Sequence, residues 1–109
     1  MKLYIGGAYQ GQAELAEREN PGASIWADFH ETVREAVLNG DRDPGAFARD
    51  FIREHPDAVM VSDEVGAGVV PVSARDRAWR EAVGRVLCLI AREAEQVTRC
   101  VCGIGVRIK

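Results

Sequence analysis

Two adjacent carboxylates, Asp63 and Glu64, are the residues of this sequence best placed to do chemistry. They come directly after a short apolar run, Ala58 to Val61, and just before a glycine-rich loop. A run this short with no helical period is typical of a strand buried on both faces. Open α/β sheets place ligand sites at the carboxyl ends of strands, where phosphate-handling proteins use an Asp to hold Mg²⁺. We predict a metal site at Asp63 and Glu64; a strand that ends in a polar turn is the alternative.

A glycine-rich segment near the N-terminus has the layout of a phosphate-binding loop. Gly6 and Gly11 have G-x-x-x-x-G spacing, and the segment lies between an apolar run and residues that favour a helix. Gln12 stands where a lysine would reach the β- and γ-phosphates, and Ala13 where a hydroxyl would bind Mg²⁺. Backbone N–H groups and a helix N-terminus can still hold an anion, but without the cation a transition state is stabilised far less. A glycine-rich turn without a ligand is the alternative. The predicted loop consists of Gly6, Gly7, Ala8, Tyr9, Gln10, Gly11, Gln12 and Ala13.

A third set of candidates lies on one face of a long predicted helix, 74–95. Arg77, Arg80 and Arg85 could neutralise phosphate charge there, or they could simply form a solvated face. The opposite face carries an apolar stripe at spacings of three and four, and Gly84 within the helix predicts a close approach to another backbone.

The elements that must position these residues alternate between strand and helix. This order predicts an α/β fold with a small, mostly parallel sheet of about four strands and right-handed crossovers. Asp28, the Asp43-Pro44 pair and Ser73 are the expected helix starts, and Gly103 to Gly105 is expected to form a turn. The expected strands are 2–5, 23–27, 58–61 and 97–101, and the expected helices are 14–18, 29–38, 44–54 and 74–95.

Size and charge exclude several classes of protein. The chain of 109 residues predicts a single domain, 1–109, and no stretch has the ~20 apolar residues of a membrane span. The net charge of −3 argues against a nucleic-acid surface. The first residues form too short an apolar run for a signal peptide, so we expect a cytoplasmic protein. Trp26 and Trp79 favour a homo-oligomer that hides apolar surface.

The three cysteines predict small buried thiols in a reducing compartment. They are an odd number without metal-ligand spacing, and Cys100 and Cys102 would share one face of a strand.

The C-terminal half resembles a known family. The motifs are Asp63-Glu-Val-Gly-Ala-Gly-Val-Val-Pro71, then Arg77-Ala-Trp-Arg80 and Gly84-Arg-Val86, then Gly103-Ile-Gly-Val-Arg-Ile-Lys109. They are similar to the C-terminal part of adenosylcobinamide kinase/adenosylcobinamide-phosphate guanylyltransferase. Residues 1–18 match that family more loosely, through the glycines of the loop.

This resemblance implies a small three-layer, P-loop-NTPase-like α/β domain that is homo-oligomeric, binds GTP or ATP with Mg²⁺, and belongs to cobalamin biosynthesis. The family phosphorylates adenosylcobinamide, a corrinoid, and then transfers GMP to it through a guanylylated His. His30 is the candidate for that nucleotidyl acceptor, and a partly exposed helix histidine is the alternative. The family's loop Lys and Ser are Gln12 and Ala13 here, and residues 19–57 are far shorter than the family's middle segment.

Three hypotheses follow. The chain is a compact, active kinase and nucleotidyltransferase, with the metal at Asp63 and Glu64. Or it is a non-catalytic relative that binds nucleotide or corrinoid as a sensor or partner subunit, which the loss of the loop cation favours. Or it is a structural protein that kept only the sheet, which the carboxylates beside a glycine loop disfavour.

Overall fold

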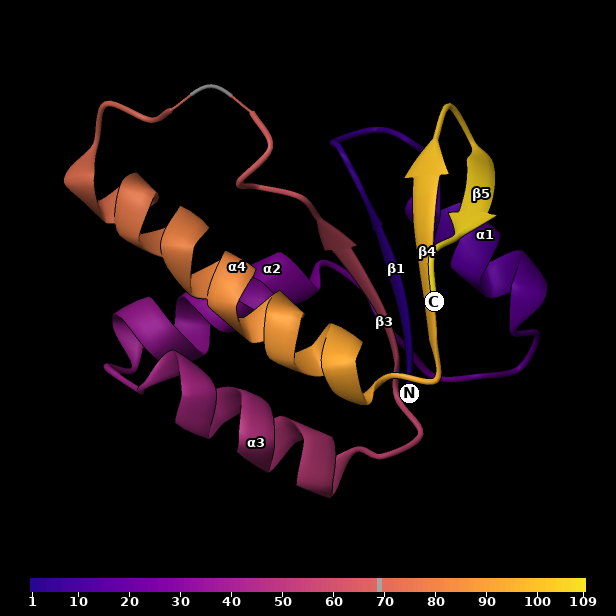
Figure 1. Cartoon of the computed structure of the whole chain (residues 1–109), viewed down its shortest axis with the longest axis horizontal. Helices are drawn as coiled ribbons and strands as arrows, with labels where there is room; N and C mark the ends of the chain where they lie inside the picture. Colours follow the sequence, from indigo (N-terminus) through magenta and orange to yellow (C-terminus); the bar gives the residue numbers. More distant parts are fainter. Residues whose placement is uncertain (69) are drawn as a thin grey trace.

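The sheet of this protein has five strands in the order β2-β3-β1-β4-β5, and Figure 1 labels β3, β1, β4 and β5. The computed structural model describes residues 1–68 and 70–109, so Val69 of the glycine-rich motif lies outside the described residues. β1 (Lys2–Gly6) lies at the centre and pairs in parallel with β3 (Val59–Asp63) and β4 (Gln96–Val101). The short β2 (Ile25–Trp26) pairs in parallel with β3, and β5 (Ile104–Arg107) is antiparallel to β4.

Helices cover both faces of the sheet, which gives three layers (Figure 1). On one face α2 (Phe29–Val33), the π-helical turn η1 (Arg34–Asn39), α3 (Pro44–Glu54) and α4 (Ala74–Glu93) enclose the larger core. On the other face α1 (Gln12–Glu19) packs on Tyr4, Val61 and Cys100. The α/β class and the three layers are therefore confirmed.

The helix starts follow local chemistry, with one exception. The Asp43 carboxylate accepts from the Ala46 N–H, and the Ser73 hydroxyl accepts from the Asp76 N–H, so both are N-caps as expected. Asp28 is not: its φ of 51° is left-handed and its side chain makes no cap hydrogen bond. The helix expected over 29–38 keeps its buried stripe, Phe29, Val33 and Val37, but widens into η1 after Val33.

Two expectations about the C-terminal region are wrong. Gly103 and Gly105 do not form one turn; the turn is Cys102-Gly103, with φ of 51° and 77°, and residues 104–107 form the fifth strand. Positive φ at both central residues is typical of the tight type I′ hairpin. Gly84 approaches no other backbone, because a Cβ built on it would meet nothing within 4 Å.

The cysteines also differ from expectation. Cys100 is buried on β4, whereas Cys102 is exposed in the turn and Cys88 is exposed on α4. Cys100 and Cys102 therefore do not share a strand face.

No helix among the described residues is long and apolar enough to cross a membrane.

Candidate functional site

The Gly6–Gly11 loop connects the end of β1 to the start of α1, as its glycine spacing predicts. Gly11 has a φ of 85°, and a Cβ on it would lie 3.2 Å from the Cα of Gly103. A Cβ on Gly6 would lie only 2.7 Å from the carbonyl oxygen of Cys100. The first glycine is therefore required by close packing against β4, and the second by a left-handed backbone.

The β4–β5 turn fixes the loop from the side. The Gln10 carboxamide oxygen accepts from the Cys102 N–H at 2.7 Å, and its backbone carbonyl accepts from the Gly103 N–H at 2.8 Å. Sequence reasoning missed this anchor. The signal that could have found it is Gly103 as the second residue of a two-residue turn between β-branched segments.

The free groups of the loop are its backbone N–H donors. Apart from the turn at Ala8 and Tyr9, no hydrogen bond within residues 1–68 and 70–109 uses the N–H groups of 8–14 as its donor. The first turn of a helix leaves such donors free, and together they make a site for an anion.

Gln12, at the position of the missing lysine, turns back under the loop. Its side-chain Nε2 donates to the carbonyl oxygens of Gly6 (3.3 Å) and Gly7 (3.0 Å) and to Oδ1 of Asp63 (3.0 Å). Gln12 is only 5% exposed, and within the described residues its buried Oε1 has no hydrogen-bond partner. The side chain thus links the loop to the end of β3 but supplies no charge.

Asp63 and His30 form a second contact at the end of β3. The Nδ1 atom of His30 accepts from the Asp63 N–H at 3.0 Å, so the ring proton is on Nε2, which lies 3.7 Å from Oδ2 of Asp63. The Trp79 indole N–H donates to the His30 carbonyl at 2.9 Å. His30 is 7% exposed, so the alternative of a partly exposed helix histidine is wrong.

The second carboxylate, Glu64, does not join Asp63. Its Oε1 lies 3.4 Å from Nε of Arg99, and it lines a different cavity, next to Gly84 and Leu87. Adjacent residues at a strand end point to opposite faces, which explains the separation. Arg99 went unnoticed in the sequence because only the strand pairing brings it beside the β3 end.

The pocket at the loop is small and acidic. Its volume is about 330 Å³. Among the residues described, its lining contains three carboxylates, Glu14, Asp28 and Asp63, and no Lys or Arg. The full lining is Ala8, Tyr9, Gly11, Gln12, Ala13, Glu14, Asp28, Val61 and Asp63.

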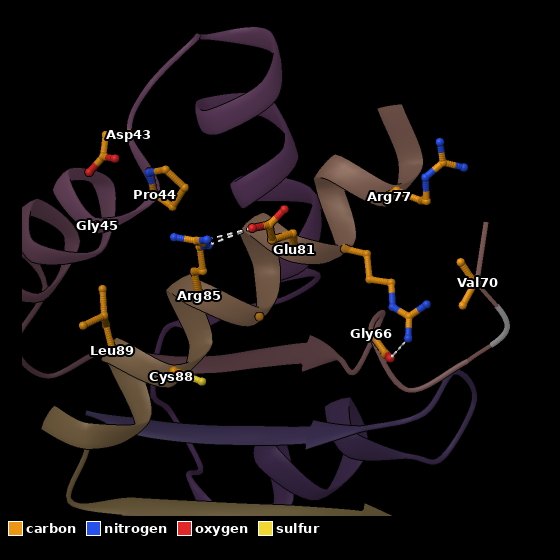
Figure 2. Close-up of a pocket in the computed structure, with 12 residues that line it drawn as sticks. Asp43, Pro44, Gly45, Gly66, Val70, Arg77, Glu81, Arg85, Cys88 and Leu89 are labelled. Carbon is orange, nitrogen blue, oxygen red and sulfur yellow. Dashed lines mark hydrogen bonds and ion pairs between the residues drawn. The ribbon is translucent and has the colours of Figure 1, made fainter. Parts of the chain in front are cut away.

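The three candidate arginines line a separate and larger groove of about 780 Å³ (Figure 2). Arg80 donates to the Gly66 carbonyl, Arg85 pairs with Glu81 at 2.7 Å, and Arg77 donates to the Pro71 carbonyl. The groove also has apolar walls, which Val70 and Leu89 supply from opposite sides in Figure 2. The structure therefore does not bring the arginines to the glycine loop.

The residues at the loop fit Mg²⁺ only in part. Mg²⁺ is usually held by one or two carboxylates together with phosphates and water. Asp63 is one such carboxylate, with a side chain that is 33% exposed, and Ala13 offers no ligand. No cluster of three or more His, Cys, Asp or Glu among the described residues could hold a metal by itself.

Burial raises the pKa of two side chains on the face of the sheet that α1 covers. Desolvation raises the pKa of Tyr4, and its hydrogen bond to Glu19 raises that pKa further. Desolvation, followed by the charge of Glu19, raises the pKa of Cys100. Both groups stay protonated at neutral pH, so neither supplies a nucleophile there.

Comparison with known proteins shows which family the C-terminal part of the chain resembles. The family model described as cobinamide kinase / cobinamide phosphate guanyltransferase matches residues 41–108. The bifunctional adenosylcobalamin biosynthesis protein CobU of Escherichia coli (strain K12) is 47% identical over 51 residues, which are 47% of this chain and 28% of that protein. The protein of the same name from Salmonella typhimurium (strain LT2) is 45% identical over 51 residues, which again are 47% of this chain and 28% of that protein.

The matched range has consequences for the site. It contains β3, Asp63, Glu64 and the arginines of α4, whereas the glycine loop and His30 precede it. The resemblance of residues 63–109 is thereby confirmed, and that of residues 1–18 stays a prediction. The match spans little more than a quarter of the relatives' length. Because the family model covers more than half of these 109 residues, the chain belongs to the cobinamide kinase / cobinamide phosphate guanyltransferase family.

Proposed function

We propose that this protein acts in cobalamin biosynthesis and binds GTP or ATP at the Gly6–Gly11 loop. The names of its relatives support the pathway. The geometry of the loop supports the ligand: free backbone N–H groups at the N-terminus of α1 are suited to phosphate, and Asp63 lies in the same pocket.

We further propose that the chain alone binds nucleotide without transferring it, as a sensor or partner subunit. The observation that carries this is the Gln12 amide, which takes the lysine's place under the loop and brings no positive charge. Losing even one positioned hydrogen-bond donor typically costs about 3–4 kcal/mol of transition-state stabilisation. Mg²⁺ would reach the site with the nucleotide and be held there by Asp63, phosphate oxygens and water.

The groove in Figure 2 is the proposed place for a corrinoid such as adenosylcobinamide. A corrinoid has a broad, partly apolar ring with amide side chains. The groove offers the apolar Val70 and Leu89 beside arginine donors, in a volume of about 780 Å³. Arg80→Ala should weaken corrinoid binding, followed by the change in absorbance of the ring, and leave nucleotide binding unchanged.

An active transferase is the second candidate, and the contact between His30 and Asp63 favours it. A carboxylate 3.7 Å from Nε2 could stabilise a charged imidazole during nucleotidyl transfer. Incubation with labelled GTP should then leave an acid-labile label that His30→Ala abolishes. An unlabelled wild-type protein would end this candidate.

The proposed nucleotide binding is tested by titration calorimetry with GTP and ATP, with and without Mg²⁺. We expect weak binding that Mg²⁺ strengthens, and loss of the Mg²⁺ effect in Asp63→Asn. Absence of heat for both nucleotides at millimolar concentration would overturn the proposal. Gel filtration tests the accompanying proposal of a homo-oligomer, which a monomeric elution volume would refute.

A further inference from the structure

An exposed stripe of aliphatic side chains lies on one face of the sheet, at its β5 end. Its members are between 48% and 68% exposed: Val101, Ile104, Val106 and Ile108. The pairing of β4 with β5 places them on the face that carries α4, because Val97 packs in that core and Cys100 packs on the α1 side. Most of the large apolar side chains that are exposed in the described part of the chain belong to this stripe. A cluster of this kind is typical of an interaction surface, whereas scattered single residues are not.

The outer edge of β5, beside this stripe, is open. β5 is the last strand of the sheet, and among the described residues β4 is the strand that lies next to it (Figure 1). Ile108 donates to the carbonyl of Val97, so the even-numbered residues of this segment bond toward β4. Gly105 and Arg107 therefore direct their N–H and carbonyl groups outward, as a strand does that has room for a partner strand.

A second copy of β5 fits this edge in one register. In an antiparallel pair with a two-fold axis at Val106, the outward groups of Gly105 meet those of Arg107 in the second copy. Every outward N–H and carbonyl group of β5 then has a partner. On the α4 face, Val106 lies opposite Val106 of the second copy and Ile104 lies opposite Ile108, so the two stripes become continuous.

The charges select the same register. With the axis at Val106, Arg107 lies opposite Gly105 of the second copy, which has no side chain. An axis at Arg107 would place the two arginines directly opposite each other, which is unfavourable in a sheet. An axis at Gly105 would place Arg107 opposite Gly103, which belongs to the turn and has a left-handed backbone.

We propose that two copies of this chain associate through β5, antiparallel and centred on Val106, so that one sheet continues across the dimer. This surface specifies the homo-oligomer that accompanies the proposed function, and it does not depend on binding of nucleotide or corrinoid. The interface consists of one short strand and one stripe from each copy, so the dimer dissociates on dilution.

Sedimentation velocity over a range of protein concentrations is the first test. We expect a dimer fraction that rises with concentration in the wild type, and a monomer in Val106→Lys, because two ammonium groups would then face each other. Val72→Lys is the control, since Val72 is 96% exposed outside the stripe, and it should dimerise like the wild type.

A dimer that persists in Val106→Lys would overturn the β5 interface and leave the homo-oligomer standing. A wild-type protein that stays monomeric up to about 1 mM would overturn both. Calorimetry with GTP decides nucleotide binding separately in either case.

Cross-linking tests the register even if Val106→Lys fails to fold. The background is Cys88→Ser with Cys102→Asn, which removes the exposed thiols and keeps a residue that favours the turn. In this background, oxidation with diamide should convert Val106→Cys to a covalent dimer, because a pair at the two-fold axis is about 4.5 Å apart between Cα atoms, within disulfide reach.

Ile104→Cys is the matched control for the cross-link. It has the same exposed, aliphatic surroundings, but in this register the two substituted positions are four residues out of line, about 13 Å apart. It should stay monomeric under the same oxidation. Equal cross-linking of the two variants, or none in Val106→Cys, would contradict the proposed interface.

Discussion

The structure separates the candidate residues into two regions, the pocket at the glycine loop with Asp63 and the groove along α4 with the arginines. The loop pocket has three carboxylates and free backbone N–H groups, but no Lys or Arg among the residues described. The groove has three arginines and apolar walls, and its arginines are held by Gly66, Glu81 and Pro71. We propose that the loop pocket receives the phosphates of a nucleotide and that the groove receives a larger, less charged ligand.

The two regions also differ in which part of the chain supplies their polar groups. In the loop pocket the polar groups that can bind a ligand are backbone N–H groups. Their positions are fixed by the close packing of Gly6 and by the left-handed backbone of Gly11. In the α4 groove the polar groups are side chains, those of Arg77, Arg80 and Arg85. Changes to the backbone and changes to side chains should therefore affect the two regions differently.

The largest expected effect is at Gly6. Gly6→Ala would place a Cβ 2.7 Å from the Cys100 carbonyl, a backbone atom that cannot move aside, and should destabilise the protein by about 3 kcal/mol in urea unfolding. Gly84→Ala is the matched control in the groove, since its Cβ meets nothing and alanine favours a helix. It should stabilise by roughly 0.5–1 kcal/mol. Equal effects at the two glycines would refute this contrast.

His30→Ala should have the next largest effect. It removes the acceptor of the Asp63 N–H and leaves a cavity beside Trp79, for an expected cost of about 2–3 kcal/mol in the same assay. His30→Gln can keep an acceptor near that N–H and should recover part of the loss. If both variants are as stable as the wild type, the contact with Asp63 does not hold the end of β3.

Gln12→Lys combined with Ala13→Ser should restore the missing groups of the loop. We expect about tenfold tighter GTP binding in the presence of Mg²⁺, because a positive charge and a hydroxyl ligand then face the phosphates. Calorimetry measures the gain, and Arg80→Ala provides the control in the groove, with no change expected. Unchanged affinity in the double variant would show that the loop is not the phosphate site.

The smallest expected effect is a loss of stability at alkaline pH. The pKa of Tyr4 is raised from 10.0 and that of Cys100 from 9.0, chiefly by burial, so the unfolded chain loses these protons first. Their contribution to stability is therefore full below about pH 9 and falls as the pH rises further. Tyr4→Phe should flatten this fall in Tm between pH 8 and 11. Tyr9→Phe, at a fully exposed tyrosine, should leave it unchanged.

Much of this architecture is predictable from the sequence because its signals are local. Glycine spacing predicts the loop, the apolar stripe predicts α4, and a short apolar run predicts the buried β3. The fifth strand was missed because Gly103-Ile-Gly105 resembles a turn, whereas the turn residues are Cys102 and Gly103.

The composition of the two sites was less predictable, because it depends on contacts between distant segments. The arginines of α4 turn toward the Gly66 loop and Glu81, and Arg99 reaches Glu64 only because β4 lies beside β1. The link from Gln12 to Asp63 joins residues 51 positions apart. No spacing rule for neighbouring residues could have shown that the carboxylates and arginines belong to different pockets.

The central claim, that the glycine loop and not the arginine groove receives the nucleotide phosphates, is tested most directly by NMR. Titration of the ¹⁵N-labelled protein with GTP and Mg²⁺ shows which backbone N–H groups respond. We expect the largest chemical-shift changes at 8–14, the segment with the free donors, and small changes along α4. Shifts concentrated at Arg77 to Leu89, with the loop unaffected, would contradict it.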